Sequence, residues 1–194
     1  MLSKVLNKRI NNHKCIPYCP SIDFCNPSEN CALITFEGGG SLTPIPDVNV
    51  GFTVVQFPGW ITTIDSEAGG VAQTANEPSP ETSAAFVGAP NFRDIIFTNP
   101  VSNIKLFYAS VQSVTIEAYD ENNNLLGSDS GAANAGTGVN PPGDDGVFNK
   151  FDELIITIGT NDIFSLRVIA KENDTAIDNL IICIEGRGLL VKEY

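Results

Sequence analysis

The sequence predicts an all-β fold, an antiparallel β-sandwich of jelly-roll type, and three observations support this prediction. From Ala32 onward, short runs rich in Val, Ile, Thr and Phe are separated by turns that contain Gly, Asn or Pro. Several of these runs alternate between apolar and polar residues, as strands with one buried face do. No stretch shows an apolar stripe with helical spacing and helix caps. Many short strands with turns about every ten residues are typical of sandwiches and jelly rolls.

Each expected strand is an apolar or alternating run bounded by turn residues. The expected strands are residues 32–37, 50–57, 60–64, 70–74, 83–87, 93–98, 102–109, 112–120, 124–129, 151–158, 163–171 and 176–185. The alternation is clearest where Val114, Ile116 and Ala118 would share one face of a strand. Residues 120–124 predict a hairpin turn. Residues 127–146 are small and polar and offer little to bury, so we expect a mobile loop there.

The first 31 residues differ in composition from the rest of the chain. They contain the only histidine, four of the five cysteines and three prolines, without sustained periodicity. We therefore expect an irregular Cys/Pro-rich arm (1–31), one jelly-roll domain (32–186) and a C-terminal tail (187–194). The basic N-terminus is not followed by an apolar core, so it does not match a Sec signal peptide. No apolar run reaches the roughly 20 residues of a membrane span.

The charge of the chain makes some partner classes poor candidates. The formal net charge is −12, with 23 acidic residues against 11 basic ones. Four of the basic residues lie in the arm, at Lys4, Lys8, Arg9 and Lys14, so the remaining domain is more acidic still. An electrostatic field of this sign repels polyphosphates, which argues against nucleic acid and anionic membranes. Divalent cations and neutral ligands remain compatible with it.

Two carboxylates lie in the first and last expected strands, Glu37 and Asp178. If these strands pair antiparallel, the two side chains come close at one edge of the sandwich. Two neighbouring carboxylates repel each other unless a cation lies between them, and hard oxygen donors favour calcium. The alternatives are a pair of solvated edge carboxylates, or Asp178 as a turn residue before Asn179. Since calcium takes six to eight oxygens, other groups would complete the site; candidates are Asp47, Asp65, Asn76 and Asp94.

The same pairing brings Cys31 within one residue of Cys183. The two cysteines either form a disulfide between the terminal strands or leave Cys183 as a small buried residue. The arm adds Cys15, Cys19 and Cys25. These cysteines could form disulfides, remain as thiols that are free or link two chains, or bind zinc together with His13. The zinc alternative is the weakest, because no C-x2-C pair is present. Disulfides would indicate an extracellular or surface setting.

Short motifs carry a resemblance to a known family. They are Ile34-Thr35-Phe36-Glu37, Pro44-Ile45-Pro46-Asp47 with Phe52 and Trp60, Phe97-Thr98-Asn99-Pro100-Val101, Ile116-Glu117-Ala118-Tyr119-Asp120 and Ile177-Asp178-Asn179-Leu180. With these motifs the chain resembles secreted microbial jelly-roll domains that are similar to carbohydrate-binding modules of the galactose-binding-like class. The resemblance covers residues 32–186. It implies a structural calcium between the first and last strands, on Glu37 and Asp178, and a carbohydrate ligand.

Aromatic residues are the candidate ligand-binding positions. A sugar ring packs its apolar C–H face on an aromatic ring while its hydroxyls meet polar side chains. Trp60, Tyr108 and Tyr119 are the candidates, and for each the alternative is an ordinary packing role. Histidine-based catalysis is not expected, because the only histidine lies in the arm. Carboxylate pairs such as Glu117 with Asp120, or Asp152 with Glu153, could serve a glycosidase, but solvated surface charge explains them better.

We therefore expect a non-catalytic, calcium-stabilised surface module that binds carbohydrate, with no enzymatic activity. The alternative is a structural cell-surface or spore-coat-type protein, cross-linked through the cysteines of its N-terminal arm into a homo-oligomer. Either function places the protein outside the cell or on a cell or spore surface.

Overall fold

The computed structural model describes residues 29–37, 40–64, 73–79, 82–86, 91–140, 142, 146–171 and 174–185. Within these residues the regular structure consists of β-strands, with no helix. The strands are β1 (Glu29–Ile34), β2 (Thr43–Pro44), β3 (Val48–Asn49), β4 (Val54–Gln56), β5 (Trp60–Ile64), β6 (Thr82–Phe86), β7 (Phe92–Val101), β8 (Asn103–Ser110), β9 (Val114–Tyr119), β10 (Leu125–Gly131), β11 (Asp152–Thr157), β12 (Ile163–Ile169) and β13 (Thr175–Glu185). The described part holds no helix long and apolar enough to cross a membrane.

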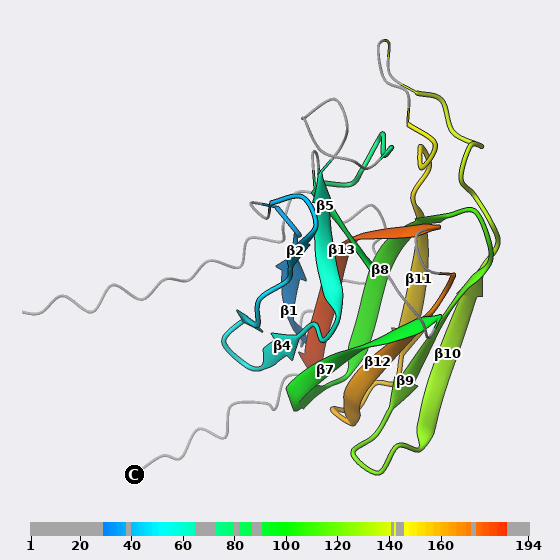
Figure 1. Cartoon of the computed structure of the whole chain (residues 1–194). Coiled ribbons are helices and arrows are strands. Elements are labelled where there is room, and N and C mark those ends of the chain that lie inside the picture. The colour runs from blue at the N-terminus through cyan, green and yellow to red at the C-terminus, as the bar shows by residue number, and fades with distance from the viewer. Residues whose placement is uncertain are drawn as a thin grey trace, which may run out of the picture.

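The strands form two antiparallel sheets. The first sheet has the order β11–β8–β13–β6–β5–β2, with β1 also paired to β13, and the second has the order β10–β9–β12–β7–β4–β3. Figure 1 shows the two sheets packed as layers, with β7, β12, β9 and β10 in front of β13, β8 and β11. This arrangement confirms the predicted all-β sandwich of jelly-roll type.

The core lies between the two layers and follows from the alternation in the sequence. On β9, Val114, Ile116 and Ala118 are each 0% exposed, whereas the residues between them are half-buried on the opposite face. On β8, Ile104 and Leu106 point into the same core. Removing these apolar side chains from water is the main force that holds the layers together. The outer face of β9 is consequently free to carry polar and aromatic side chains.

The first and last strands pair as predicted. β1 runs antiparallel to β13, with Cys31 opposite Cys183 and Ile34 opposite Leu180. Cys31 and Cys183 form a disulfide, so the alternative of a free buried thiol is wrong. Glu37 follows the end of β1 instead of lying within it, because β1 ends at Ile34. The register of β1 on β13 therefore places Cys31 directly opposite Cys183. It differs by one residue from the register that would place Glu37 opposite Asp178.

The remaining differences concern short strands and loops. β2 and β3 are two-residue strands that were not expected, and Thr74 makes only an isolated bridge to Phe148. In the described part of the 127–146 loop, Asn134 is 3% exposed and donates its amide to the carbonyl of Tyr108 at 3.0 Å and to Asp152 at 3.0 Å. This part of the loop is therefore packed on β8 by hydrogen bonds, and the expectation of a mobile loop is wrong for it.

Some expectations fall on residues that lie outside the described part. These are the course of the arm before Glu29, with Cys15, Cys19 and Cys25, the candidate calcium ligand Asp65, residues 70–72 of an expected strand, and the C-terminal tail after Glu185. Cys31, expected in the arm, is part of β1, which begins three residues before the expected domain boundary at residue 32.

Candidate functional site

Trp60 is a core residue, not an exposed platform. Its backbone N–H donates to the carbonyl of Phe57 at 3.2 Å, and Gly59 between them has a φ of 77°, which a Pro-Gly turn of this kind requires. The turn directs the indole inward, where it is 1% exposed and donates its Nε1–H to the carbonyl oxygen of Asp94 at 3.1 Å. A ring without an accessible face cannot stack on a sugar. The prediction of Trp60 as a ligand-binding residue is therefore wrong.

Tyr108 is also buried, for a different reason. It points into the core from β8, is 2% exposed, and donates its hydroxyl to the carbonyl of Ala132 at 2.8 Å. Gly131 lies directly against it: a Cβ at that position would fall 1.9 Å from the Tyr108 oxygen. Burial, followed by the charges of Asp152 and Asp129, raises the pKa of the phenol. Tyr108 anchors the loop after β10, and its prediction as a ligand-binding residue is wrong.

Tyr119 is the one predicted aromatic that lies on an outer face. It ends β9 on the side of the second sheet that faces away from the core, and it is half-buried. Its hydroxyl donates to the Oε2 atom of Glu117, two residues earlier on the same strand. This hydrogen bond is the largest cause of the raised pKa of Tyr119, so the phenol is neutral at physiological pH. One face of its ring lies beside the guanidinium of Arg167, whose Cζ is 5.4 Å from the ring centroid.

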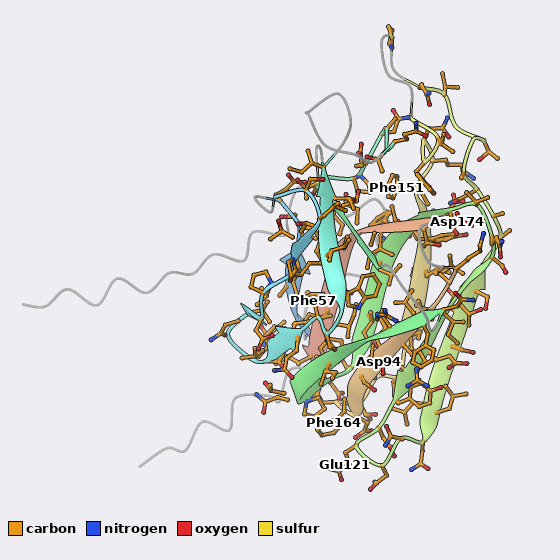
Figure 2. The ribbon with its side chains drawn as sticks, viewed as in Figure 1. Phe57, Asp94, Glu121, Phe151, Phe164 and Asp174 are labelled. Carbon is orange, nitrogen blue, oxygen red and sulfur yellow. A yellow bond between two sulfur atoms is a disulfide. The ribbon has the colours of Figure 1, made fainter. Side chains whose placement is uncertain are left out.

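Arg167 lies at the centre of this outer face, on β12. Its Nε donates to Oδ1 of Asp94 at 2.8 Å and its Nη2 to Oδ2 at 3.1 Å, a two-bond contact between planar groups. Asp94 is on β7, on the far side of β12 from Tyr119, and is labelled in Figure 2. The ion pair raises the pKa of Arg167 above its usual value. The side chains of Arg167 and Asp94 remain 35% and 32% exposed, so both reach solvent.

Strand register builds this group from three strands. Arg167 is directly opposite Glu117 on β9 and Asp94 on β7, which forms a row of charges of alternating sign. The guanidinium also stacks on Phe92, with its Cζ 4.3 Å from the ring centroid. It therefore lies between the rings of Phe92 and Tyr119. We call Phe92, Asp94, Glu117, Tyr119 and Arg167 the outer-face cluster.

The buried indole supports the outer-face cluster from inside the sandwich. Trp60 holds the main chain of Asp94 through the carbonyl hydrogen bond, while the carboxylate of the same residue holds Arg167. The cluster is thus fixed at its backbone and at its side chains. Because its donors and acceptors are already held in place on a rigid sheet, these side chains lose little conformational entropy when a ligand binds.

The predicted carboxylate pair forms a second candidate site. Asp178 on β13 is 0% exposed, and its two oxygens accept the backbone N–H groups of Ser79 at 2.6 Å and Asn179 at 2.7 Å. The pKa of Asp178 is raised to about 7, mainly by burial and to a smaller extent by the charges of Glu37 and Glu77, while the two hydrogen bonds act to lower it. The structure thus brings Glu37 close enough to Asp178 to act on its charge, and it adds Glu77, which the sequence did not indicate.

The donor chemistry of this site fits a hard cation in part. Carboxylate oxygens are calcium ligands, and the buried Oε1 atom of Glu77 has no hydrogen-bond partner. Each oxygen of Asp178 uses one lone pair for an N–H group and retains another. Among the described residues, however, no three His, Cys, Asp or Glu side chains converge into a ready metal-binding group. A cation at this place would need further oxygens from backbone carbonyls or from loop residues.

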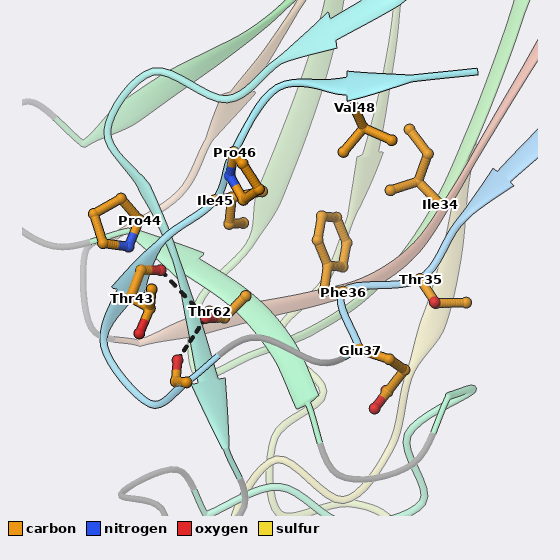
Figure 3. A pocket seen from close by; sticks show the side chains of 11 residues that line it. Ile34, Thr35, Phe36, Glu37, Thr43, Pro44, Ile45, Pro46, Val48 and Thr62 are labelled. Atoms are coloured by element: carbon orange, nitrogen blue, oxygen red, sulfur yellow. Dashed lines mark hydrogen bonds between the residues drawn. The ribbon is translucent and has the colours of Figure 1, made fainter. Parts of the chain in front are cut away.

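Glu37 also borders a pocket of about 390 Å³ between the end of β1 and the segment that contains β2 and β3. Figure 3 shows Phe36 and Ile45 on its walls, with Glu37 at one end. Thr62 closes another side, with its hydroxyl 2.6 Å from the carbonyl of Gly40 and 3.2 Å from that of Thr43. The lining contains none of the three aromatic residues predicted to bind a sugar.

Comparisons with known proteins give structural similarities only. No family model matches the chain, and no curated protein sequence matches it. The structure is similar to the K2 cleaved adhesin domain of Lys-gingipain (TM-score 0.46, 8% identity, covering 79% of this chain and 99% of that one). It is also similar to CsCBM6-3 from Clostridium stercorarium in complex with cellobiose (TM-score 0.40, 12% identity, 74% and 97%).

A third similar structure is TmCBM61 in complex with β-1,4-galactotriose (TM-score 0.34, 9% identity, 78% and 90%). These structures include modules of the class that the sequence resembles. Each of the three TM-scores is below 0.5, so these similarities concern the fold and do not identify a function.

Proposed function

We propose that this chain is a non-catalytic, calcium-stabilised surface module that binds carbohydrate at the outer-face cluster. The observation that carries the proposal is the position of Tyr119, half-buried on a rigid sheet beside the exposed ion pair of Arg167 and Asp94. A pyranose ring has an apolar C–H face and a rim of hydroxyls. Tyr119 offers an aromatic surface to the first, and the charged side chains offer hydrogen bonds to the second.

Calcium belongs to the proposal because of the environment of Asp178. A fully buried carboxylate next to Glu37 and Glu77 is costly when ionised, and a divalent cation would offset that cost. Asp178, Glu37 and Glu77 would provide oxygens, with others from nearby carbonyls. When bound, the cation would supply positive charge and hold the end of β1 to β13. Addition of calcium should raise the melting temperature of metal-free protein, because a ligand that binds only the folded state stabilises that state by mass action.

Binding is tested by affinity gel electrophoresis against soluble cellulose derivatives, xylan, galactan, mannan and dextran. We expect at least one polysaccharide to slow the wild-type protein, with about tenfold weaker binding for Tyr119→Ala, or about 1.4 kcal/mol. Tyr119→Phe is the matched control: it keeps the ring and loses only the hydroxyl that bonds Glu117. Failure of every polysaccharide to bind would contradict the proposal. Release of reducing sugar would contradict its non-catalytic part.

A second candidate function is a structural surface protein that forms cross-linked oligomers. The observation that favours it is the disulfide between Cys31 and Cys183, which leaves Cys15, Cys19 and Cys25 as an odd set. In a fully oxidised chain, at least one of these thiols must then pair with another molecule. Disulfide-linked multimers on non-reducing gels would support this function, and a purely monomeric band from oxidised protein would exclude it. Both functions agree with an extracellular or surface location.

A further inference from the structure

We propose that the Arg167–Asp94 pair makes the outer-face cluster selective for neutral glycans over glycans that carry carboxylates, and that Arg167 is the specificity-determining residue. This inference rests on the proposed carbohydrate site and names the class of sugar that the site accepts. A guanidinium has five N–H donors, and two of them are used by Asp94. Three donors remain, on a side chain that is 35% exposed.

The remaining donors lie beside acceptors. Asp94 has lone pairs left after it accepts two bonds, and Glu117 is opposite Arg167 on β9 with one oxygen, Oε1, not used by Tyr119. Neighbouring hydroxyls of a pyranose can each donate and accept. A donor and an acceptor held side by side therefore match two adjacent hydroxyls, one bonded to the guanidinium and the other to a carboxylate. Hydrogen bonds to charged groups are the stronger ones.

Two aromatic rings next to the guanidinium hold it in this position. The guanidinium lies between Phe92 and Tyr119, with Cζ 4.3 Å and 5.4 Å from the two ring centroids. Arginine stacks in this way and binds a carboxylate through two parallel bonds, whereas lysine is a point charge on a flexible stem. Replacing Arg167 by Lys would keep the charge and lose the fork and the stacking, and it would leave at most two donors where the arginine leaves three.

Charge decides between neutral and acidic sugars. Asp94 neutralises Arg167, and Glu117 then leaves the cluster with an excess of one negative charge. The chain as a whole carries −12. A uronic acid placed here would meet two carboxylates within the same row, and like charges without a cation between them repel. An unengaged arginine would attract such a sugar, but this one is already held by Asp94.

The experiment compares one polysaccharide with its own oxidised form. Of the cellulose derivatives, galactan and mannan, which have free C6 hydroxyls, the one that slows wild-type protein most in gels is selectively oxidised at C6 to uronate, and both forms are tested at low and high salt. We expect at least threefold weaker binding of the oxidised form at low salt, with a smaller difference at high salt because of screening. Arg167→Lys should bind the neutral form about tenfold more weakly. Lys150→Arg is a matched control, since Lys150 pairs with Asp152 at 3.0 Å away from the cluster.

The outcomes separate this inference from the proposed function. Equal binding of the neutral and oxidised forms, or unchanged binding by Arg167→Lys, would overturn the inference and leave carbohydrate binding in place. Failure of all polysaccharides to bind would overturn both. If Arg167→Lys melts more than a few degrees below wild type, Asp94→Asn replaces it: this variant frees the guanidinium, so the preference should move toward the oxidised form. A preference that stays unchanged in Asp94→Asn would also refute the role of the pair.

Discussion

Asp178 gives this protein an unusual dependence of stability on pH. The pKa of its carboxyl in the folded protein is about 7, against the ordinary value of 3.8. Because the folded state holds the proton more tightly, Asp178 contributes its full stabilisation below pH 3.8, and this contribution is lost as the pH rises toward 7. A difference of roughly three pKa units corresponds to about 4 kcal/mol at 1.36 kcal/mol per unit. Metal-free protein should therefore be more stable near pH 5 than near pH 8, as far as this residue is concerned.

The perturbation that isolates this effect is Asp178→Asn. An amide does not titrate, so the variant should lack the part of the pH dependence that comes from residue 178. It has one acceptor oxygen where the carboxylate has two, and it leaves the N–H of Ser79 or of Asn179 facing an NH₂ group. An unsatisfied buried donor costs about 1–3 kcal/mol. At pH 5 the variant should be less stable than wild type, and at pH 8 the difference should shrink or reverse.

The assay is urea unfolding at pH 5 and pH 8 in EDTA, followed by the same measurements in calcium. Subtracting the variant from wild type at each pH removes the contributions of other titrating groups. Calcium requires the ionised carboxylate, so it should stabilise wild type more at pH 8 than at pH 5 and leave the variant nearly unchanged. If wild type and variant show the same change between pH 5 and pH 8 in EDTA, the argument from burial is refuted. If the pH dependence is as expected but calcium does not stabilise wild type, only the calcium part of the proposed function is refuted.

Two further predictions concern packing and the disulfide. Replacing Cys31 and Cys183 together by Ser should lower the free energy of unfolding by up to about 5 kcal/mol, because the cross-link joins residues 152 positions apart in sequence. In urea unfolding, reduced wild type should match the variant. A variant with the same urea midpoint as oxidised wild type would contradict this prediction. Gly131→Ala should destabilise by about 1–3 kcal/mol, since its Cβ would lie 1.9 Å from the Tyr108 oxygen. Gly127→Ala, whose nearest contact would be 3.2 Å, is the milder control, and equal melting temperatures for the two variants would contradict the predicted clash.

The sequence predicted most of the fold because strands with one buried face have a period of two. The alternation of Val114, Ile116 and Ala118 with polar residues placed β9 and its inner face correctly. The pairing of β1 with β13 followed from two terminal β-runs, and the cysteines indicated the register that the structure has. β2 and β3 could not be predicted, since two residues carry no periodicity.

The candidate site was harder to predict, because it depends on register between strands that are distant in sequence. Arg167 and Asp94 are 73 residues apart and meet only because β12 pairs with β7 in one register. Leu166 and Val168 are buried on either side of Arg167, so Arg167 faces outward, but a shift of one residue in either strand would separate it from Asp94. Trp60 was misjudged for a related reason. A Pro-Gly turn predicts a loop end but leaves open the direction of the next side chain.

The bond between Cys31 and Cys183 also determines how the molecule would carry mechanical tension. A pull on the chain before Glu29 and after Glu185 meets this covalent link within two residues of each end of the paired strands. The load then passes from one segment to the other through the disulfide, and the chain between the two cysteines, which are 152 positions apart, is not stretched. If the protein is anchored at its two ends, the disulfide would prevent β1 and β13 from sliding past each other. The second sheet, which carries the outer-face cluster, would then keep its shape under force.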